Sequence, residues 1–240
     1  MTLYSDLGSR SINEDAVGAY EKDNTACYIL CDGLGGHGMG DVASNLVVQV
    51  FRDRFENGKL GTNPGTELER TFRAAQDILM AEQMARRAEN KMKTTAVACV
   101  VDGKKAYIAH VGDSRVYVFS KNRILKRTLD HSIPQMLAIS GEILEKDIRN
   151  HPDRNMLLRV LGVEWEKDMF DMMKPIPLRK IQAILLCSDG FWELINDDTI
   201  CKFLAASKSV EEWMEKMKSE VKANGLGKDM DNNSAIAIWF

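Results

Sequence analysis

Residues 28–40, YILCDGLGGHGMG, decide the fold, because a buried strand and a glycine-rich loop meet in this stretch. Residues 28–31 form a continuous apolar run, which is typical of a strand buried on both faces. The run stops at Asp32-Gly33, and an amphipathic helical pattern begins only after position 40. A carboxylate at the end of a buried strand, beside backbone that can adopt positive φ, commonly holds a metal ion or a phosphate. Residues 185–190, LLCSDG, repeat the arrangement, so we expect the two Asp-Gly pairs to share a site.

The same glycines also match the spacing of the dinucleotide-binding fingerprint, but the rest of the chain argues against that interpretation. Turn residues and a second helical pattern follow the first helix, whereas a nucleotide-binding fold needs a second parallel strand there. The acids about 20 residues downstream, Asp53 and Glu56, lie inside the first helical pattern. Asp32 would also place its negative charge beside the pyrophosphate.

The composition predicts a cytoplasmic globular protein. The 240 residues are expected to form one domain, 1–240, which is large enough for a sizeable core. The net charge of −3, with no basic face obvious in the sequence, argues against a nucleic-acid partner. No apolar run approaches the length of a membrane span and no signal peptide is recognised, so we expect no membrane partner. The five cysteines show no CxxC spacing and are expected to be reduced core residues. We expect a monomer.

Hydrophobic periodicity predicts two pairs of consecutive helices separated by runs of strands. Capping boxes are expected at Thr66–Glu69 and Ser209–Glu212. The predicted helices cover residues 41–55, 67–88, 197–206 and 210–223. The predicted strands cover residues 3–7, 16–20, 28–31, 95–101, 105–111, 115–119, 123–126, 156–161, 168–173, 181–187 and 234–240.

This order lacks the strand–helix alternation of a parallel sheet. We therefore expect an α+β fold, a four-layer α-β-β-α sandwich with two mostly antiparallel sheets, each flanked by a helix pair. Both sheets are then buried on both faces, which explains why the strands are continuous apolar runs and do not alternate. Short helices are expected between positions 130 and 153, where no strand pattern survives.

Six acidic residues fall at predicted strand ends or in loops rich in glycine and asparagine. Any one of them alone is more often a turn former. Gathered in one place they repel one another, so such a cluster needs cations. Oxygen ligands without a histidine or cysteine partner favour Mg²⁺ or Mn²⁺ over zinc. The six residues are Glu14, Asp15, Asp32, Asp113, Asp189 and Asp231.

The order of short motifs along the chain resembles that of the metal-dependent Ser/Thr protein phosphatases, the type 2C or PPM family. The motifs are RxxxED at positions 10–15, DGxGGH at 32–37, GDSR at 112–115, DHS at 130–132, SDG at 188–190 and DN at 231–232. They cover essentially the whole chain, and they look most like those of the compact bacterial members. The family fold is an α-β-β-α sandwich, which agrees with the layers predicted above.

The resemblance implies two tightly bound Mn²⁺ or Mg²⁺ ions. Asp32 would bridge them at the end of its strand. Asp189 and Asp231 would hold the first ion, and Glu14 with the Gly33 carbonyl would hold the second.

The resemblance further implies that Asp15 acts on the metal site through water. Asp113, together with Asp189, would hold a third and weaker ion, and Arg10 would grip the substrate phosphate with its planar fork. A water that bridges two divalent ions becomes hydroxide near neutral pH and attacks phosphorus in line. Arg10 and the metals would stabilise the charge that develops on the phosphoryl oxygens.

Some positions depart from the family pattern or fill supporting roles. Animal members carry a proposed general acid, a histidine, directly after the first Asp-Gly, where this chain has Leu34. His37 lies three residues further on, and we expect it to order the loop. Ser234 stands where a threonine is usual, and Asn232 is expected to support the Asp231 loop. In the family, residues 134–152 correspond to a flap beside the active site.

The predicted function is hydrolysis of phosphoserine and phosphothreonine in proteins, the targets of a Ser/Thr kinase. One alternative is a phosphatase of a small phosphoester or of a single dedicated regulator, because the acids define the reaction and the surface defines the substrate. Another is a pseudophosphatase that only binds, although all the expected metal acids are present.

Overall fold

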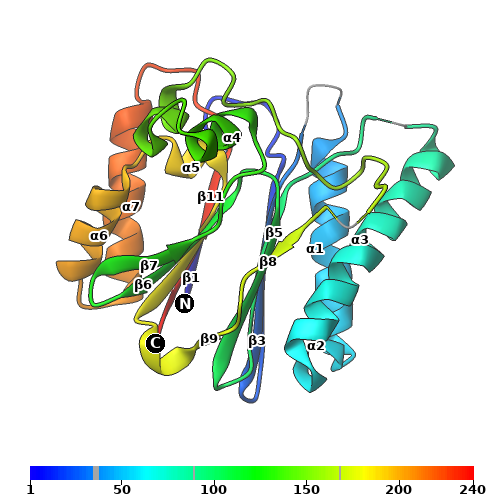
Figure 1. The fold of residues 1–240 in the computed structure, drawn as a ribbon, viewed down its shortest axis with the longest axis horizontal. Coiled ribbons are helices and arrows are strands. Elements are labelled where there is room, and N and C mark those ends of the chain that lie inside the picture. The colour runs from blue at the N-terminus through cyan, green and yellow to red at the C-terminus, as the bar shows by residue number, and fades with distance from the viewer. Residues whose placement is uncertain (35–37, 89, 168) are drawn as a thin grey trace.

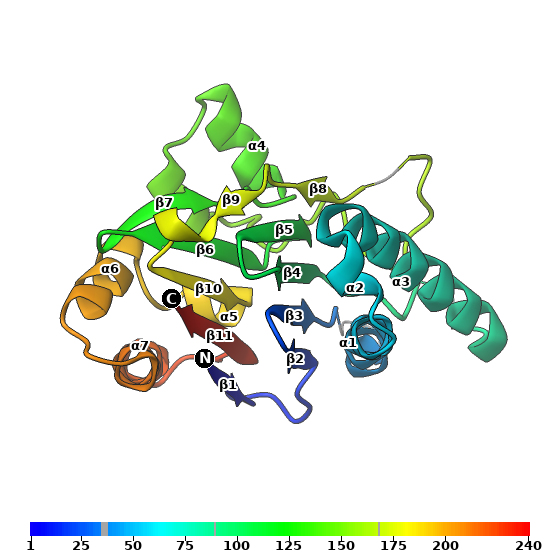
Figure 2. The ribbon, with the colours of Figure 1, turned by 90° about the horizontal axis from the view of Figure 1, so that it is seen from below.

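Two antiparallel sheets pack face to face, and helices cover both outer faces (Figure 1). The computed structural model describes residues 1–34, 38–88, 90–167 and 169–240. The predicted four-layer α+β sandwich is confirmed. Figure 2, seen along the strands, shows the sequence of layers from α6 and α7 on one side to α1 and α3 on the other.

The first sheet has the strand order β2-β3-β4-β5-β8, and β9 also pairs with β5. In the β2–β3 hairpin, Asp15 lies opposite Asp32, so the register alone places two of the predicted acids side by side. The strands are β2 (Asp15–Lys22), β3 (Thr25–Asp32), β4 (Ala96–Val101), β5 (Lys105–Val111), β8 (Asp171–Met172) and β9 (Ile176–Pro177).

The second sheet has the strand order β1-β11-β10-β6-β7. In its centre, Cys187 at the end of β10 lies opposite both Arg115 and Ala235. The loops that precede β6 and β11 and the loop that follows β10 therefore emerge at the same end of the sheet. The strands are β1 (Thr2–Asp6), β6 (Arg115–Ser120), β7 (Arg123–Arg127), β10 (Ala183–Cys187) and β11 (Asn233–Trp239).

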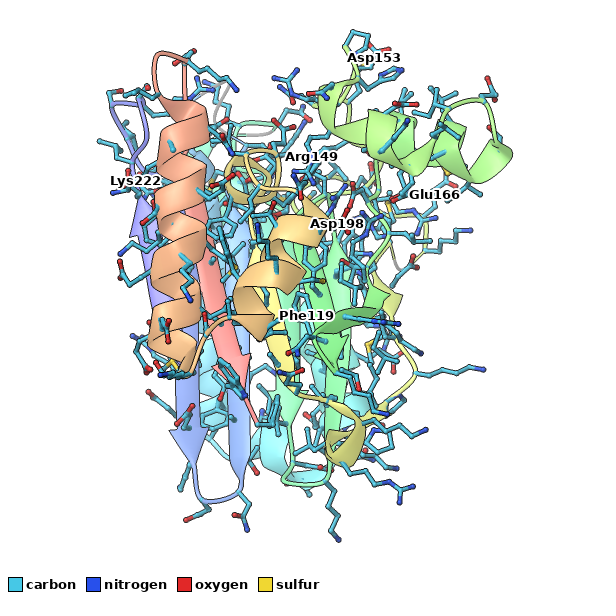
Figure 3. The ribbon with its side chains drawn as sticks, turned by 90° about the vertical axis from the view of Figure 1, so that its left-hand side faces the viewer. Phe119, Arg149, Asp153, Glu166, Asp198 and Lys222 are labelled. Atoms are coloured by element: carbon cyan, nitrogen blue, oxygen red, sulfur yellow. The ribbon has the colours of Figure 1, made fainter. Side chains whose placement is uncertain are left out.

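Each sheet carries its own helices. Figure 3 shows α6 and α7 in front of the second sheet, and Figure 1 shows α1, α2 and α3 on the outer side of the first. The short helices α4 and α5 lie at the end of the sandwich where Asp189 is found, whereas α2 lies at the opposite end (Figure 1). The helices are α1 (Gly40–Glu56), α2 (Lys59–Thr62), α3 (Pro64–Arg86), α4 (Ile133–Ser140), η1 (Glu145–Asn150), η2 (Leu178–Lys180), α5 (Asp189–Trp192), α6 (Asp197–Ala205) and α7 (Val210–Gly225).

Three apolar clusters fill the spaces between the four layers. The middle cluster includes Leu30, Val97 and Leu186 and lies between the two sheets. The outer clusters pack Phe51 and Phe72 of the first helix pair, and Trp213 of the second, against their sheets. Every residue of β4 is buried, as expected for a strand covered on both faces. Within the described part of the chain, no helix combines the length and the apolar character that a membrane crossing needs.

The sequence prediction is wrong in several local features. Residues 156–161 do not form the predicted strand. They make two isolated bridges, Leu157 with Ser132 and Leu161 with Thr94, because the segment turns between two different partners and does not follow one strand. Residues 168–173 reduce to the two residues of β8, and Asp168 lies outside the described residues. The strand β9 and the short helices α2 and α5 were not predicted.

One of the two predicted helix caps is also wrong. Helix α3 begins two residues earlier than the predicted cap Thr66, at Pro64, whose fixed φ suits the first helical position. Ser209 does cap α7, and its Oγ accepts a hydrogen bond from the Glu212 N–H. In a capping box, the Glu212 carboxylate would accept a hydrogen bond from the Ser209 N–H. Here it accepts from the N–H of the preceding residue, Lys208.

A buried ion pair anchors β6 to the segment before α4. Arg115 Nε and Nη2 donate to the two oxygens of Asp130 at 2.9 and 2.6 Å, and both side chains are almost fully buried. The Arg115 guanidinium also stacks on the Trp192 ring at 3.4 Å. Removal of one partner leaves an uncompensated charge in the interior.

We therefore expect Asp130→Ala to lower the free energy of unfolding by about 3–5 kcal/mol, measured by urea titration with Mn²⁺ present. Asp198→Ala, which removes an exposed carboxylate from the first turn of α6, is the matched control and should cost less than about 1 kcal/mol. Equal losses in the two variants would contradict a structural role for the pair.

Candidate active site

The predicted acids meet at one end of the sandwich, where strands of both sheets begin or end. A cavity of about 630 Å³ opens there. Asp32 ends β3 of the first sheet, and Asp113 lies in the turn that connects β5 of the first sheet to β6 of the second. Asp189 starts α5 after β10, and Asp231 lies in the loop before β11. The predicted site residues in its wall are Arg10, Glu14, Asp32, Gly33, Asp113, Asp189, Asp231 and Asn232.

Asp32 is fixed by the end of β3 and by a threonine of the neighbouring strand. Its backbone N–H donates to Thr95 Oγ1 at 3.1 Å, and its carbonyl accepts from the Thr95 N–H at 2.8 Å. Thr95 Oγ1 lies 2.8 Å from Ser114 Oγ, which joins this strand end to the turn that carries Asp113. The position of Asp32 is therefore set by both sheets.

Asp113 and Asp189 are held by the elements that flank them. Asp113 lies in the tight turn between β5 and β6, and its carbonyl accepts from Trp192 Nε1 at 3.0 Å. Asp189 follows β10 and starts α5. Gly190 has no room for a side chain, because a Cβ would collide with the Asn232 carbonyl. The Asp-Gly pair thus lets the SDG and DN loops touch.

Asn232 ties the loop before β2 to the Asp231 loop, the supporting role expected for it. Its Nδ2 donates to the carbonyls of Leu7 and Ile12 at 2.8 and 3.1 Å, and its Oδ1 accepts from the Glu14 N–H at 2.8 Å. The Glu14 carbonyl in turn accepts from the Gly33 N–H at 3.0 Å. A Cβ at Gly33 would collide with the Gly40 carbonyl, so only glycine fits beside Asp32.

Asp15 lies behind the cavity and is 7% exposed. Its Oδ2 accepts from Ser188 Oγ at 2.9 Å, whereas its Oδ1 has no partner among the described residues. Ser188 Oγ also accepts from the Ser234 N–H at 2.9 Å. Burial is the main reason why the pKa of Asp15 is raised to about 7, and the charges of Asp189 and Asp231 add to the effect.

The acids in the cavity wall also resist ionisation. Burial raises the pKa values of Asp32 and Asp113 well above the usual range and raises that of Asp189. The charge of Asp189 adds to the first two shifts, and the charge of Asp231 adds to the third. The pKa of Glu14 is raised by burial and by Asp41 and Asp231. Among the described lining residues none is a histidine or a cysteine. The oxygen donors, their shared repulsion and the orphaned Asp15 Oδ1 together fit hard divalent cations.

Arg10 stands at the rim of the cavity and pairs with one of the predicted metal ligands. Its Nε and Nη2 donate to Asp231 Oδ1 and Oδ2 at 3.1 and 3.0 Å, and both side chains are about half exposed. The Arg10 guanidinium, which is predicted to bind the substrate phosphate, thus binds the Asp231 carboxylate in this structure. His37, which we expected to order the loop, lies outside the described residues.

Sequence reasoning missed four residues that contribute to the site. Ser188 belongs to the SDG motif, which was the signal for it. Trp192 was interpreted only as a packing residue, yet its indole N–H also fixes the Asp113 carbonyl. Glu193 lies one helical turn after Asp189, and burial with the Asp189 charge raises its pKa to about 7. Asp41 opens α1 beside Glu14.

The raised pKa of Asp15 makes a prediction about the metal-free protein. An acid with a raised pKa in the folded state destabilises that state as pH rises from its unfolded value near 4 through about 7. Asp15→Asn should therefore stabilise the protein in chelator by about 2–4 kcal/mol at pH about 8, and much less at pH about 5. Thermal unfolding at the two pH values measures the difference. Parallel pH profiles for wild type and variant would contradict a raised pKa.

The comparisons with known proteins agree with this geometry. Residues 4–231 match the sequence profile of the family described as protein phosphatase 2C. The serine/threonine phosphatase stp of Listeria welshimeri is 35% identical over 240 residues, which cover 95% of this chain and 90% of the relative. The serine/threonine protein phosphatase PstP of Mycobacterium tuberculosis is 30% identical over 84% of this chain and 38% of its own.

Solved structures share the fold over nearly the whole chain. The serine/threonine phosphatase Stp1 of Staphylococcus aureus has a TM-score of 0.89 at 30% identity, covering 100% of this chain and 94% of that one. The catalytic domain of PstP in complex with two manganese ions has a TM-score of 0.80 at 27% identity, covering 98% and 95%. The chain therefore belongs to the protein phosphatase 2C family, the metal-dependent serine/threonine phosphatases.

Proposed function

We propose that this protein hydrolyses phosphoserine and phosphothreonine in other proteins, with Mn²⁺ or Mg²⁺ held in the cavity at the end of the two sheets. One observation carries the proposal: five carboxylates and one arginine from both sheets converge on that cavity. When bound there, the ions supply a nucleophile from water at neutral pH and withdraw charge from the phosphoryl group.

The carboxylates divide into two tight sites and one weak site in this proposal. Asp32 belongs to both tight sites. Asp189 and Asp231 complete one of them, and Glu14 with the Gly33 carbonyl completes the other. Support comes from the shared wall of the cavity and from the raised pKa values of Asp32 and Asp189, which are due first to burial and then to neighbouring carboxylates.

Asp113, with Asp189, forms the weak third site. Its carboxylate is buried, and its pKa is raised by burial and by the Asp189 charge. With only these two residues assigned to it, an ion there depends largely on water ligands and should bind weakly. Asp15 acts from behind the cavity, where it holds Ser188 and offers its free Oδ1 to an ordered water.

Arg10 binds the substrate phosphate. A guanidinium has a planar fork that suits two phosphoryl oxygens as well as it suits a carboxylate. The bidentate contact with Asp231 supports this role, because it brings the guanidinium to the acid cluster. When an ion neutralises Asp231, the same fork becomes available to a phosphate at the cavity.

The protein substrate extends beyond the metal cavity. A second cavity of about 320 Å³ adjoins it and shares Arg10, Asp189 and Asp231. Arg149 and Asn150, from the flap predicted at 134–152, line that second cavity, and α4 of the same segment projects from the sandwich (Figure 2). The flap thus lies where it can contact residues on either side of the phosphorylated one, which favours protein substrates over a small phosphoester.

We place the enzyme in the cytoplasm as a monomer with one catalytic domain, 1–240, that opposes a Ser/Thr kinase. The support for the compartment is chemical: all five cysteines are free thiols, and four of them are buried.

The first test is metal dependence. Wild type should hydrolyse a phosphothreonine peptide with Mn²⁺ and lose that activity in excess chelator. Asp32→Asn and Asp189→Asn should each lower kcat by at least about 100-fold, because each removes a ligand from the paired ions. Asp23→Asn, at the exposed turn at the other end of the β2–β3 hairpin, is the matched control and should behave as wild type. Full activity in chelator would rule out the metal mechanism.

The second test separates substrate binding from metal binding. Arg10→Ala should raise KM for the phosphopeptide about 10- to 100-fold, because a charge-assisted hydrogen-bond pair is lost. Its affinity for Mn²⁺ should be equal to that of wild type or higher, because Arg10 no longer competes for Asp231. Arg52→Ala, an exposed arginine of α1, is the control. A variant that loses Mn²⁺ and keeps KM would assign Arg10 another role.

A further inference from the structure

The turn that carries Asp113 is held from outside the cavity by His131. The His131 backbone N–H donates to the Gly112 carbonyl at 2.9 Å. In the opposite direction, the Gly112 N–H donates to His131 Nδ1 at 3.3 Å. One histidine therefore satisfies both backbone groups of the residue directly before Asp113.

The second ring nitrogen of His131 is also engaged. Because Nδ1 accepts a hydrogen bond, the ring proton must sit on Nε2, which lies 3.0 Å from Asp171 Oδ2. The His131 side chain is buried, and Asp171 stands at the edge strand β8 with Arg159 at 3.4 Å from its other oxygen. Asp171 thus selects the one tautomer in which Nδ1 can accept from Gly112.

The turn needs this support because the backbone conformation of Gly112 and the charge of Asp113 are both unfavourable there. Gly112 has φ +98°, and a Cβ there would lie 2.5 Å from Thr95 Cγ2, so the backbone approaches β4 very closely. Burial, together with the charges of Asp189 and Asp130, raises the pKa of Asp113, so an ionised carboxylate is unfavourable on this turn. The Trp192 bond to the Asp113 carbonyl, the contact between the Ser114 and Thr95 hydroxyls, and the His131 bonds to Gly112 hold the turn in place.

A metal ion is the other candidate for this cluster, because His110, His131 and Asp171 offer ligand atoms within 4.8 Å of one another. The ring geometry argues against it. His110 and His131 stack with centroids 4.7 Å apart and planes 21° apart. An imidazole lone pair lies in the plane of its ring, so one ion cannot lie in the planes of two stacked rings. Both nitrogens of His131 are moreover occupied.

We propose that His131 is a positioning residue that holds the Gly112–Asp113 turn so that the Asp113 carboxylate faces the weak metal site, and that Asp171 fixes the tautomer it needs. This inference rests on the proposed role of Asp113 as a metal ligand. The neighbouring Asp130 binds Arg115. Two residues of the DHS motif therefore form hydrogen bonds with the GDSR motif, His131 with Gly112 before Asp113 and Asp130 with Arg115 after it.

Two substitutions separate the two ring nitrogens. In His131→Asn, the amide oxygen takes the place of Nδ1 and can still accept from the Gly112 N–H. In His131→Gln, the amide nitrogen takes the place of Nε2 and can donate to Asp171, but the acceptor for Gly112 is lost. Calorimetric titration with Mn²⁺ should show that the Gln variant weakens only the weakest site, by about 10- to 100-fold, and that the Asn variant stays close to wild type.

His110→Gln is the matched control for the loss of a buried imidazole in the same stack. Its amide nitrogen can still donate to the Leu129 carbonyl, which His110 Nε2 contacts at 2.8 Å. It should lower thermal stability and leave all Mn²⁺ affinities unchanged. Nitrogen-15 shifts of the metal-free wild type should report the Nε2–H tautomer at His131, and Asp171→Ala should mix the two tautomers.

The inference is overturned if the Asn and Gln variants have the same weak-site affinity, if His110→Gln weakens that site as much, or if the shifts report the Nδ1–H tautomer. A wild type that binds only two ions also overturns it, whereas phosphopeptide hydrolysis would still support the proposed function. Conversely, a wild type that binds Mn²⁺ but does not hydrolyse phosphopeptides would contradict the proposed function and leave the positioning role intact.

Discussion

The constraint on which the rest of the structure depends is the repulsion among carboxylates that are gathered and partly buried in one cavity. Burial and the charges of neighbouring carboxylates raise the pKa values of Asp32, Asp113 and Asp189, so the metal-free protein meets a free-energy cost at neutral pH. A rigid frame must hold these groups in place until cations arrive. The two sheets supply it, because their apolar interiors pack without involving the acids.

The frame works because the acids come from different sheets that share one end. The hairpin register sets Asp15 against Asp32 in the first sheet, and Ser188 of the second sheet donates to Asp15. Thr95 and Ser114 join the sheets again next to Asp113. At this end of the sandwich, small polar side chains thus connect the two sheets beside the apolar core, while Asp32 and Asp113 line the cavity. Cations bound there would neutralise groups from both sheets and so stabilise their packing.

Most of the fold and the acid cluster could be predicted, because both depend on local patterns. Apolar runs that end in Asp-Gly identified the strand ends at Asp32 and Asp189. Residues 156–161 could not be predicted, because their apolar pattern is that of a strand while their backbone pairs with two separate segments. The proposed role of His131 could not be predicted from the sequence either, because it depends on contacts with Gly112 and Asp171, which lie 19 and 40 residues away along the chain. Such contacts are set by tertiary structure and not by spacing.

The contact between Arg10 and Asp231 links the two halves of the proposed chemistry. A guanidinium fork can serve one bidentate partner at a time, so Arg10 cannot hold Asp231 and a phosphate together. An ion that takes the Asp231 oxygens releases the fork, and a phosphate that takes the fork releases Asp231. Coupling between two ligands is reciprocal, so Mn²⁺ should raise the affinity for phosphate by the same factor as phosphate raises the affinity for Mn²⁺. If Arg10 and Asp231 have the proposed roles, the ion pair in the metal-free protein withholds the arginine from phosphate until the metal site is filled.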